Sequence, residues 1–276
     1  MLPHPALTGL GWDPAWEAAF APFAAAGRLP ARVVVAHRDA WIVAGTGPGP
    51  KPGTGPRPKP GTGGGADGSG ASDGSGDRDA VISGRFRHET LGPGDLPAVG
   101  DWVAISNTDP AVISAVLPRR SAFGRNRDDG QVAADQVLAA NVDVAFVVAG
   151  LDGDFNPRRI ERYLAVAWSG NTTPVILLNK ADTTHDLDSL RIAAEAVAPG
   201  VEVRAVSARS GHGIDDLRRD ILTPGRTAVL LGSSGVGKST LVNALLGEAR
   251  QRTGAVREAD SRGHHTTRHR ELVRLP

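Results

Sequence analysis

Short runs of β-branched and aromatic residues mark the first part of the chain, and Gly, Pro or Asp bounds each run. Runs of this kind are typical of strands. Five strands are predicted, at Arg32–Val35, Trp41–Ala44, Ala80–Arg85, Trp102–Ile105 and Ala111–Leu117. Five short strands so close together favour a small all-β barrel of the oligonucleotide-binding (OB) type, although a β-sandwich would give much the same pattern.

The pattern changes at Asn141, where strands begin to alternate with helices. Val142–Ala149 is a continuous apolar run, as expected of a parallel strand that is covered on both faces. Three more strands are predicted at Pro174–Leu178, Val201–Val206 and Thr227–Leu231, and four helices at Arg158–Trp168, Leu187–Val197, Ile214–Leu222 and Lys238–Leu246. This alternation predicts an α/β domain with a mostly parallel sheet.

Residues 45–79 interrupt the predicted barrel with a low-complexity sequence, in which GTGPGPKP at 45–52 recurs as GTGPRPKP at 53–60. Such a composition cannot bury enough apolar surface to offset the chain entropy, so a disordered insertion is predicted. Its basic residues, Lys51 among them, leave open a role as an arm that touches RNA.

The predicted division of the 276 residues is an N-terminal extension over 1–29, an OB-like barrel over 30–120 with the insertion 45–79, a linker over 121–140, and an α/β domain over 141–276. A net charge of +1 neither requires nor excludes a nucleic-acid partner. The chain has no cysteine, which excludes disulfides and a cysteine-based zinc site. No signal peptide and no membrane span is predicted, so we expect a cytoplasmic protein without a membrane partner.

A phosphate-binding motif follows the strand predicted at Thr227–Leu231. It fits G-x-x-x-x-G-K-[ST] at every fixed position and consists of Gly232, Ser233, Ser234, Gly235, Val236, Gly237, Lys238 and Ser239. The glycines let backbone N–H groups surround a phosphate at the positive end of the next helix. Lys238 is expected to reach the β- and γ-phosphates, Ser239 to bind Mg²⁺, and Thr240 to donate to the α-phosphate.

A base-recognition motif, Asn179, Lys180, Ala181 and Asp182, follows the strand at Pro174–Leu178. Open α/β sheets place their ligands at this end of a strand. The Asp182 carboxylate can accept from N1–H and from the exocyclic amine of guanine, whereas adenine offers neither donor, so the site would reject it. The alternative is that Asp182 caps the following helix. Ser207, Ala208 and Arg209 follow the next strand, where their N–H groups can meet the guanine O6.

These motifs resemble those of translation-factor-class GTPases, but the base-recognition motifs precede the phosphate loop in the chain. A circularly permuted GTPase domain behind a small barrel resembles the ribosome small-subunit-dependent GTPase family, RsgA. The stretches 152–164 and 263–267 are also similar to that family. Permutation is physically tolerable because the termini of domains often lie close together.

The resemblance implies a GTP-hydrolysing ribosome biogenesis factor (a P-loop GTP phosphohydrolase) that binds GTP or GDP with Mg²⁺ and acts late in maturation of the 30S subunit, with 16S rRNA as partner and as a monomer. It also implies that Thr266 or Thr267 closes over Mg²⁺ and that His265, with Lys238 and Thr267, contributes to catalysis. A mobile, solvated loop at His264, His265 and His269 is the alternative.

The chain departs from the family in two ways. No D-x-x-G element follows the predicted strand Glu271–Leu275, and the family's C-terminal zinc module is absent from the sequence. We therefore expect an incomplete GTPase domain, with an exposed edge at the phosphate-loop strand and with reduced turnover. An RNA-binding module that uses GTP or GDP only as a conformational ligand is the alternative function, and a P-loop kinase or ATPase is a third, which Asp182 disfavours.

RNA contact is predicted from the barrel and from basic residues ahead of the α/β domain. Arg119, Arg120, Arg125 and Arg127 can touch phosphates, or can belong to a solvated linker.

Overall fold

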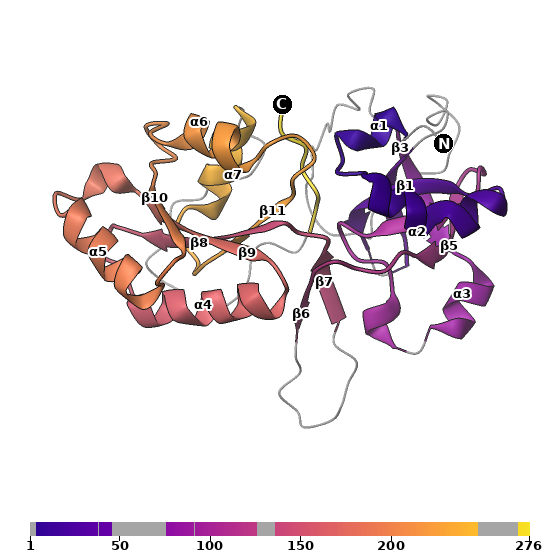
Figure 1. The fold of residues 1–276 in the computed structure, drawn as a ribbon, viewed down its shortest axis with the longest axis horizontal. Helices are drawn as coiled ribbons and strands as arrows, with labels where there is room; N and C mark the ends of the chain where they lie inside the picture. Colours follow the sequence, from indigo (N-terminus) through magenta and orange to yellow (C-terminus); the bar gives the residue numbers. More distant parts are fainter. Residues whose placement is uncertain (1–3, 38, 46–75, 91, 126–135, 248–269) are drawn as a thin grey trace, which may run out of the picture.

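The computed structural model describes residues 4–37, 39–45, 76–90, 92–125, 136–247 and 270–276. Two lobes lie side by side, with a barrel and the N-terminal helices in one and an α/β sheet in the other (Figure 1). No helix in the described ranges is long and apolar enough to cross a membrane.

Five strands close the barrel in the order β1-β2-β3-β5-β4. They are β1 (Leu29–Ala36), β2 (Trp41–Gly45), β3 (Asp77–Ile82), β4 (Trp102–Ile105) and β5 (Ala111–Val116). β3 and β5 pair in parallel, and the other neighbours, including the closing pair β1 and β4, are antiparallel. Alternate residues such as Val33, Val43 and Ile113 fill the interior, as the two-residue period of a strand requires. The predicted OB-like barrel is confirmed.

The third barrel strand differs from its prediction at both ends. β3 begins at Asp77, inside the segment 45–79 that was predicted to be disordered, because its alternation buries Arg78 and Ala80. The strand also stops before Arg85, since Ser83 caps a new helix, α3 (Gly84–Glu89), by accepting from the Phe86 N–H at 3.0 Å. A short 3₁₀ turn, η1 (Pro93–Asp95), follows α3.

Two helices of the N-terminal segment cover the barrel. They are α1 (Pro5–Thr8) and α2 (Pro14–Ala25). Trp12 and Phe20 form an aromatic cluster with Trp102 of β4, and the rings of Trp12 and Trp102 meet edge to face with centroids 4.7 Å apart. The extension predicted over 1–29 therefore contributes a second core to the barrel lobe.

The α/β lobe has four parallel strands in the order β10-β9-β8-β11, which confirms the predicted parallel α/β fold. They are β8 (Val144–Gly150), β9 (Thr173–Asn179), β10 (Glu202–Ala205) and β11 (Ala228–Leu231). Helices α4 (Pro157–Ser169) and α5 (Leu187–Val197) pack on one face. The other face carries α6 (Ile214–Asp216) and α7 (Lys238–Leu246), as Figure 1 shows, and the π-helical turn η3 (Leu217–Ile221) packs into the same core.

The segment 121–140, predicted to be a linker, contains an antiparallel pair of strands. β6 (Ala122–Arg125) pairs with β7 (Gln136–Ala140) between the two lobes (Figure 1). Phe123 of β6 is buried with Val142 and Ala167 against the α/β sheet. The pair therefore belongs to the packed structure of the α/β lobe.

Asn141 joins the lobes through its backbone and its side chain. Its side chain donates to the Gly100 carbonyl at 3.1 Å and accepts from the Arg120 N–H at 2.9 Å. Its own carbonyl accepts from buried Arg32 of β1 at 3.0 Å, and burial lowers the pKa of Arg32 to about 10. Asn141 adopts a left-handed backbone conformation, with φ of 55°, that asparagine tolerates better than most residues.

Two arginines that were predicted either to contact RNA or to lie in a solvated linker are engaged within the chain. The Arg119 guanidinium forms a bidentate pair with fully buried Asp101, at 2.9 and 2.7 Å. Arg120 pairs with Asp13 at the start of α2, at 2.6 and 2.7 Å, and holds the pKa of Asp13 down to about 2. Arg119 therefore braces the barrel lobe, and Arg120 ties the segment before β6 to α2. Arg127 and the side chain of Arg125 lie outside the described residues.

The predicted strand Glu271–Leu275 is wrong. Only Glu271 forms a bridge, which is antiparallel to Val35, and the Leu272 N–H donates to the Val34 carbonyl at 2.8 Å. This contact exists because β1 has a bulge between Val33 and Val35 that leaves Val34 out of the β2 register. The described C-terminal segment therefore starts against the barrel at Glu271 and Leu272, and its Leu275 packs against the core of the α/β sheet.

Breaking the buried Asp101–Arg119 pair tests its contribution to stability. Asp101→Asn should lower the free energy of unfolding by about 3–5 kcal/mol, because it leaves the Arg119 cation without its buried counter-charge. Urea denaturation measures this. Glu89→Ala, which removes the exposed partner of Arg85, is the control and should change little. Equal stabilities of the two variants would contradict the assignment.

Candidate functional site

The phosphate-loop sequence lies between β11 and α7, at the carboxyl ends of the parallel strands. Gly237 precedes α7 in the left-handed conformation, with φ of 96°. Lys238, Ser239 and Thr240 form the first turn of that helix and are half-buried. The helix start therefore supplies free N–H groups and a positive dipole end beside the loop.

Close packing explains the glycines at two positions of the loop. A Cβ at Gly237 would lie 2.4 Å from Asn179 Nδ2, and one at Gly232 would lie 2.7 Å from the Val148 carbonyl oxygen. Both distances are too short for a real carbon atom, so any larger residue would displace the loop. These glycines bring the loop against β8 and the base-recognition segment, and their cradle fits a phosphate.

Lys238 lies inside this cradle. Its Nζ donates to the carbonyl oxygens of Gly232 at 2.9 Å and of Ser233 at 2.6 Å. Burial lowers the pKa of Lys238, and the carboxylate of Asp154 opposes that shift. The ammonium group therefore lies within the curl of the loop, where it can meet the β- and γ-phosphates.

Asn179 connects the predicted motifs in space. It ends β9 and is 1% exposed. Its amide Nδ2 donates to the Val236 carbonyl at 2.8 Å, and its Oδ1 accepts from the Ala208 N–H at 3.2 Å. One buried side chain thus joins the phosphate loop to both segments that were predicted to read the base.

Asp182 and Ser207 are in direct contact. The Ser207 hydroxyl donates to Asp182 Oδ1 at 2.6 Å, and this hydrogen bond lowers the pKa of Asp182 and keeps its carboxylate charged. Asp182 lies in the 3₁₀ turn η2 (Ala181–Thr183), and the residue before α5 is Asp186. The alternative role of Asp182 as a helix cap is therefore wrong, and its exposed carboxylate is available as an acceptor.

Lys180 reaches back across the site. Its Nζ donates to the Gly235 carbonyl at 2.8 Å and pairs with Asp152. The residue has a left-handed backbone, with φ of 65°, which turns its side chain toward the phosphate loop. The side chain of Lys180 therefore links the end of β9 to the phosphate loop.

Two further charged residues touch the phosphate loop and were given no role from the sequence. Asp154 Oδ2 accepts from the Ser233 hydroxyl at 2.7 Å, and Arg159 of α4 pairs with Asp154 at 2.5 Å. Burial raises the pKa of Asp154, but the hydrogen bonds from Ser233 and Arg159 outweigh it and hold the pKa below its usual value. Their position after the carboxyl end of a buried strand is the signal that indicates a ligand site.

Arg209 lies near Asp182 and contributes to the lowering of the Asp182 pKa. The predicted switch residues His265, Thr266 and Thr267 lie outside the described residues, as do His264 and His269. In the described part of the chain, no group of three His, Asp or Glu side chains is arranged to hold a metal ion.

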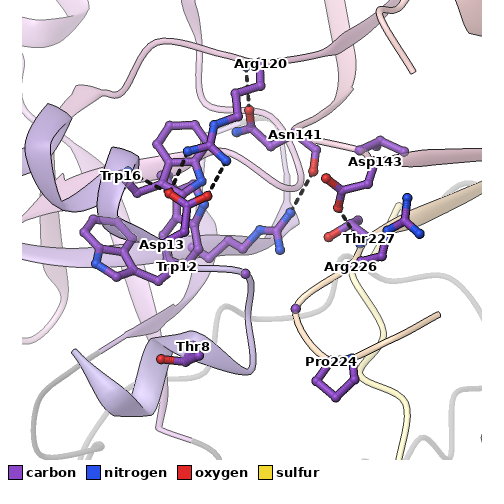
Figure 2. Close-up of a pocket in the computed structure, with 15 residues that line it drawn as sticks. Thr8, Trp12, Asp13, Trp16, Arg120, Asn141, Asp143, Pro224, Arg226 and Thr227 are labelled. Carbon is purple, nitrogen blue, oxygen red and sulfur yellow. Dashed lines mark hydrogen bonds and ion pairs between the residues drawn. The ribbon is translucent and has the colours of Figure 1, made fainter. Parts of the chain in front are cut away.

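A cavity of about 280 Å³ lies at the junction of the lobes, away from these motifs. It is lined by Asn141 and Asp143 before β8 and by Thr227 before β11, at the amino ends of the strands. Figure 2 shows Arg120 paired with Asp13, and Asp143 accepting from the Thr227 N–H. The cavity therefore belongs to the junction of the lobes, and the motifs gather at the opposite edge of the sheet.

The fold and the order of its motifs define a class of protein, the circularly permuted P-loop GTPase fold beside a small barrel. The structure of YjeQ from Thermotoga maritima superposes with a TM-score of 0.54 at 23% identity, covering 79% of this chain and 64% of that one. The structure of YloQ, described as a circularly permuted GTPase, superposes with a TM-score of 0.53 at 18% identity, covering 81% of this chain and 66% of that one.

Sequence comparison identifies the family. The RsgA GTPase family model matches residues 116–276. The small ribosomal subunit biogenesis GTPase RsgA of Opitutus terrae is 43% identical over 281 residues, covering 98% of this chain and 68% of the relative. The protein of the same name from Xanthomonas campestris pv. campestris is 41% identical over 282 residues, covering 98% of this chain and 67% of that relative. The chain belongs to the RsgA GTPase family.

Replacing Gly237 tests whether close packing forms the site. Gly237→Ala should weaken the binding of guanine nucleotide by about 10- to 100-fold, because the new Cβ forces Asn179 away and strains a left-handed position. Titration with a fluorescent GDP analogue measures the affinity. Gly84→Ala, where a Cβ would meet nothing within 4 Å, is the control and should bind like the original chain. Unchanged affinity in Gly237→Ala would refute this packing argument.

Proposed function

We propose that this chain binds guanine nucleotide and hydrolyses GTP during maturation of the small ribosomal subunit. The observation that carries the proposal is the buried Asn179 amide, which joins the phosphate loop at Val236 to the segment at Ala208. A nucleotide has a phosphate end and a base end, and this contact fixes the distance between the two groups of residues that would hold them.

Each part of the nucleotide has a matching set of residues in the proposed complex. Lys238 and the N–H groups of residues 232–240 hold the phosphates, and the Ser239 hydroxyl holds Mg²⁺. Asp182 accepts from the guanine edge, and the N–H groups of residues 207–209 face its O6. The Mg²⁺ ion, when bound, neutralises charge that develops on the phosphates.

The proposed switch residues complete this assignment. Thr267, or its neighbour Thr266, closes over Mg²⁺ and the γ-phosphate, and His265 contributes to hydrolysis. These roles come from the matching positions in the RsgA family, in the segment that follows α7.

The proposed partner is the 30S subunit, with 16S rRNA as the surface recognised. Support comes from the relatives named small ribosomal subunit biogenesis GTPase RsgA and from the barrel, a fold whose surface is suited to oligonucleotides. We propose that the chain acts as a monomer in the cytoplasm, where its partner is located.

Replacing the Asp182 carboxylate, which only accepts hydrogen bonds, with an amide that can also donate tests recognition of the base. Asp182→Asn should weaken GDP binding by about 100-fold or more and favour xanthosine diphosphate, because the amide can donate to the oxygen that replaces the guanine amine. Competition between the two nucleotides measures the preference.

Asp186→Asn is the matched control for this experiment. Asp186 lies in the same loop and its side chain makes no cap hydrogen bond with α5, so guanine preference should persist. A preference for guanine that survived in Asp182→Asn would contradict the proposed site.

Single-turnover hydrolysis tests the reaction. The chain should hydrolyse bound GTP faster when purified small ribosomal subunits are added, and Lys238→Ala should slow it by about 100-fold, because it removes a charge that stabilises the transition state. Release of labelled phosphate measures the rate. GTP binding without any hydrolysis on the subunit would instead support a module that uses the nucleotide only as a conformational ligand.

A further inference from the structure

A carboxylate and a guanidinium meet at a hydroxyl of the phosphate loop. Arg159 Nη1 donates to the Ser233 hydroxyl at 3.0 Å and to Asp154 Oδ1 at 2.5 Å, and the same hydroxyl donates to Asp154 Oδ2 at 2.7 Å. Ser233 is the second residue of the loop, and Arg159 comes from the first turn of α4. A cation from another element is thus held directly against the loop.

The position of Lys238 shows which end of the nucleotide this cation would face. The lysine of a phosphate loop reaches the β- and γ-phosphates. Lys238 Nζ lies 2.6 Å from the Ser233 carbonyl oxygen, and Asp154 is close enough to act on the charge of Lys238. Arg159 is therefore a second cation at the β,γ end of the loop.

Stability of α4 does not explain an arginine at this position. A cation in the first turn of a helix is opposed by the helix dipole, and no acidic residue lies in the first turn of α4. The Asn156 side chain caps the helix by accepting from the Arg159 N–H, which requires only the backbone of Arg159. The Arg159 side chain is 32% exposed, so its guanidinium can reach a ligand.

We propose that Arg159 binds the γ-phosphate of GTP, and that Asp154 holds its guanidinium beside the loop for that purpose. The inference rests on the proposed function of this site. A guanidinium presents a planar fork of N–H groups that matches phosphate oxygens, so it can exchange the carboxylate of Asp154 for a phosphate. Asp154 would be repelled by the terminal phosphate, which favours this exchange.

The affinity for GTP relative to GDP tests the proposal, because only GTP carries the γ-phosphate. Arg159→Ala should weaken the binding of a non-hydrolysable GTP analogue by about tenfold or more and leave the affinity for GDP close to its original value. Taking the ratio within one variant cancels any loss of folded protein. Arg158→Ala, which removes the exposed neighbour on the same turn, is the matched control and should leave both affinities unchanged.

Two further variants separate this role from a structural one. Arg159→Lys should restore part of the preference for the GTP analogue, because it keeps the charge but loses the fork. Asp154→Asn should strengthen the binding of the GTP analogue relative to that of GDP, because it removes the carboxylate that repels the γ-phosphate. If Asp154 and Arg159 only braced the loop, each variant, Asp154→Asn and Arg159→Ala, would lower the affinities for the GTP analogue and for GDP by the same factor. That result would overturn the proposal.

Hydrolysis supplies a second readout of Arg159. An arginine that stabilises transferring phosphoryl groups contributes about 10³- to 10⁵-fold to turnover, so single-turnover hydrolysis on the small subunit should fall steeply in Arg159→Ala. If the unaltered chain bound neither nucleotide, the proposed function itself would fail. If the original chain bound both nucleotides and Arg159→Ala had the same ratio of GTP-analogue affinity to GDP affinity as the original chain, this inference alone would be overturned.

Discussion

A buried amide side chain, that of Asn179, holds the site together. It stands at the carboxyl end of β9, the strand next to β8, and therefore lies in the middle of the sheet edge where the loops converge. Both of its polar atoms are hydrogen bonded to backbone in different segments, at Val236 and Ala208. A buried polar group is costly unless its partners are present, so the loops on both sides are held in register with β9. The glycine at 237 is the complement of this contact, because only a residue without a Cβ fits there.

The second constraint is the way the lobes are joined. Asn141 and buried Arg32 connect the barrel to the strand that enters the α/β sheet, and the Asp101–Arg119 pair braces the barrel side next to Gly100. These groups are largely removed from water, so each depends on its partner more than a surface ion pair does. The junction lies at the amino ends of β8 and β11, and the nucleotide motifs lie at the carboxyl ends of β9, β10 and β11. The barrel is therefore attached to the sheet without occupying the edge that the site needs.

Local sequence patterns predicted most of the elements. The strand Trp102–Ile105 and the helices Leu187–Val197 and Lys238–Leu246 have the bounds that their patterns predicted, because periodicity and caps act within one element. Contacts between distant segments were not predictable in this way. Arg119 looks like any basic residue near a linker until Asp101 is placed beside it. The bulge at Val34 that receives Leu272 likewise depends on the register of β1 and β2.

In the candidate site, too, the local motifs were predicted and the contacts between distant segments were not. Its phosphate loop and Asp182 were predicted because their spacing follows from the shape and hydrogen-bonding groups of a nucleotide. The contacts of Asp154 and Arg159 with the phosphate loop were not predicted, since neither residue belongs to a motif that names a ligand. Their meaning comes from the contact with Ser233, which the sequence separates from Asp154 by 79 positions.

The charges around the phosphate loop show a consistent arrangement. The segment after β8 supplies a carboxylate to each of two cations at the loop: Asp152 pairs with Lys180, and Asp154 pairs with Arg159. Asp154 also acts on Lys238, against the effect of burial on its pKa. Because phosphate carries the same sign of charge as these carboxylates, a nucleotide bound as proposed would compete with Asp154 for Arg159. In the proposed complex, the phosphate and the segment between β8 and α4 would therefore act on each other through the charge of Arg159.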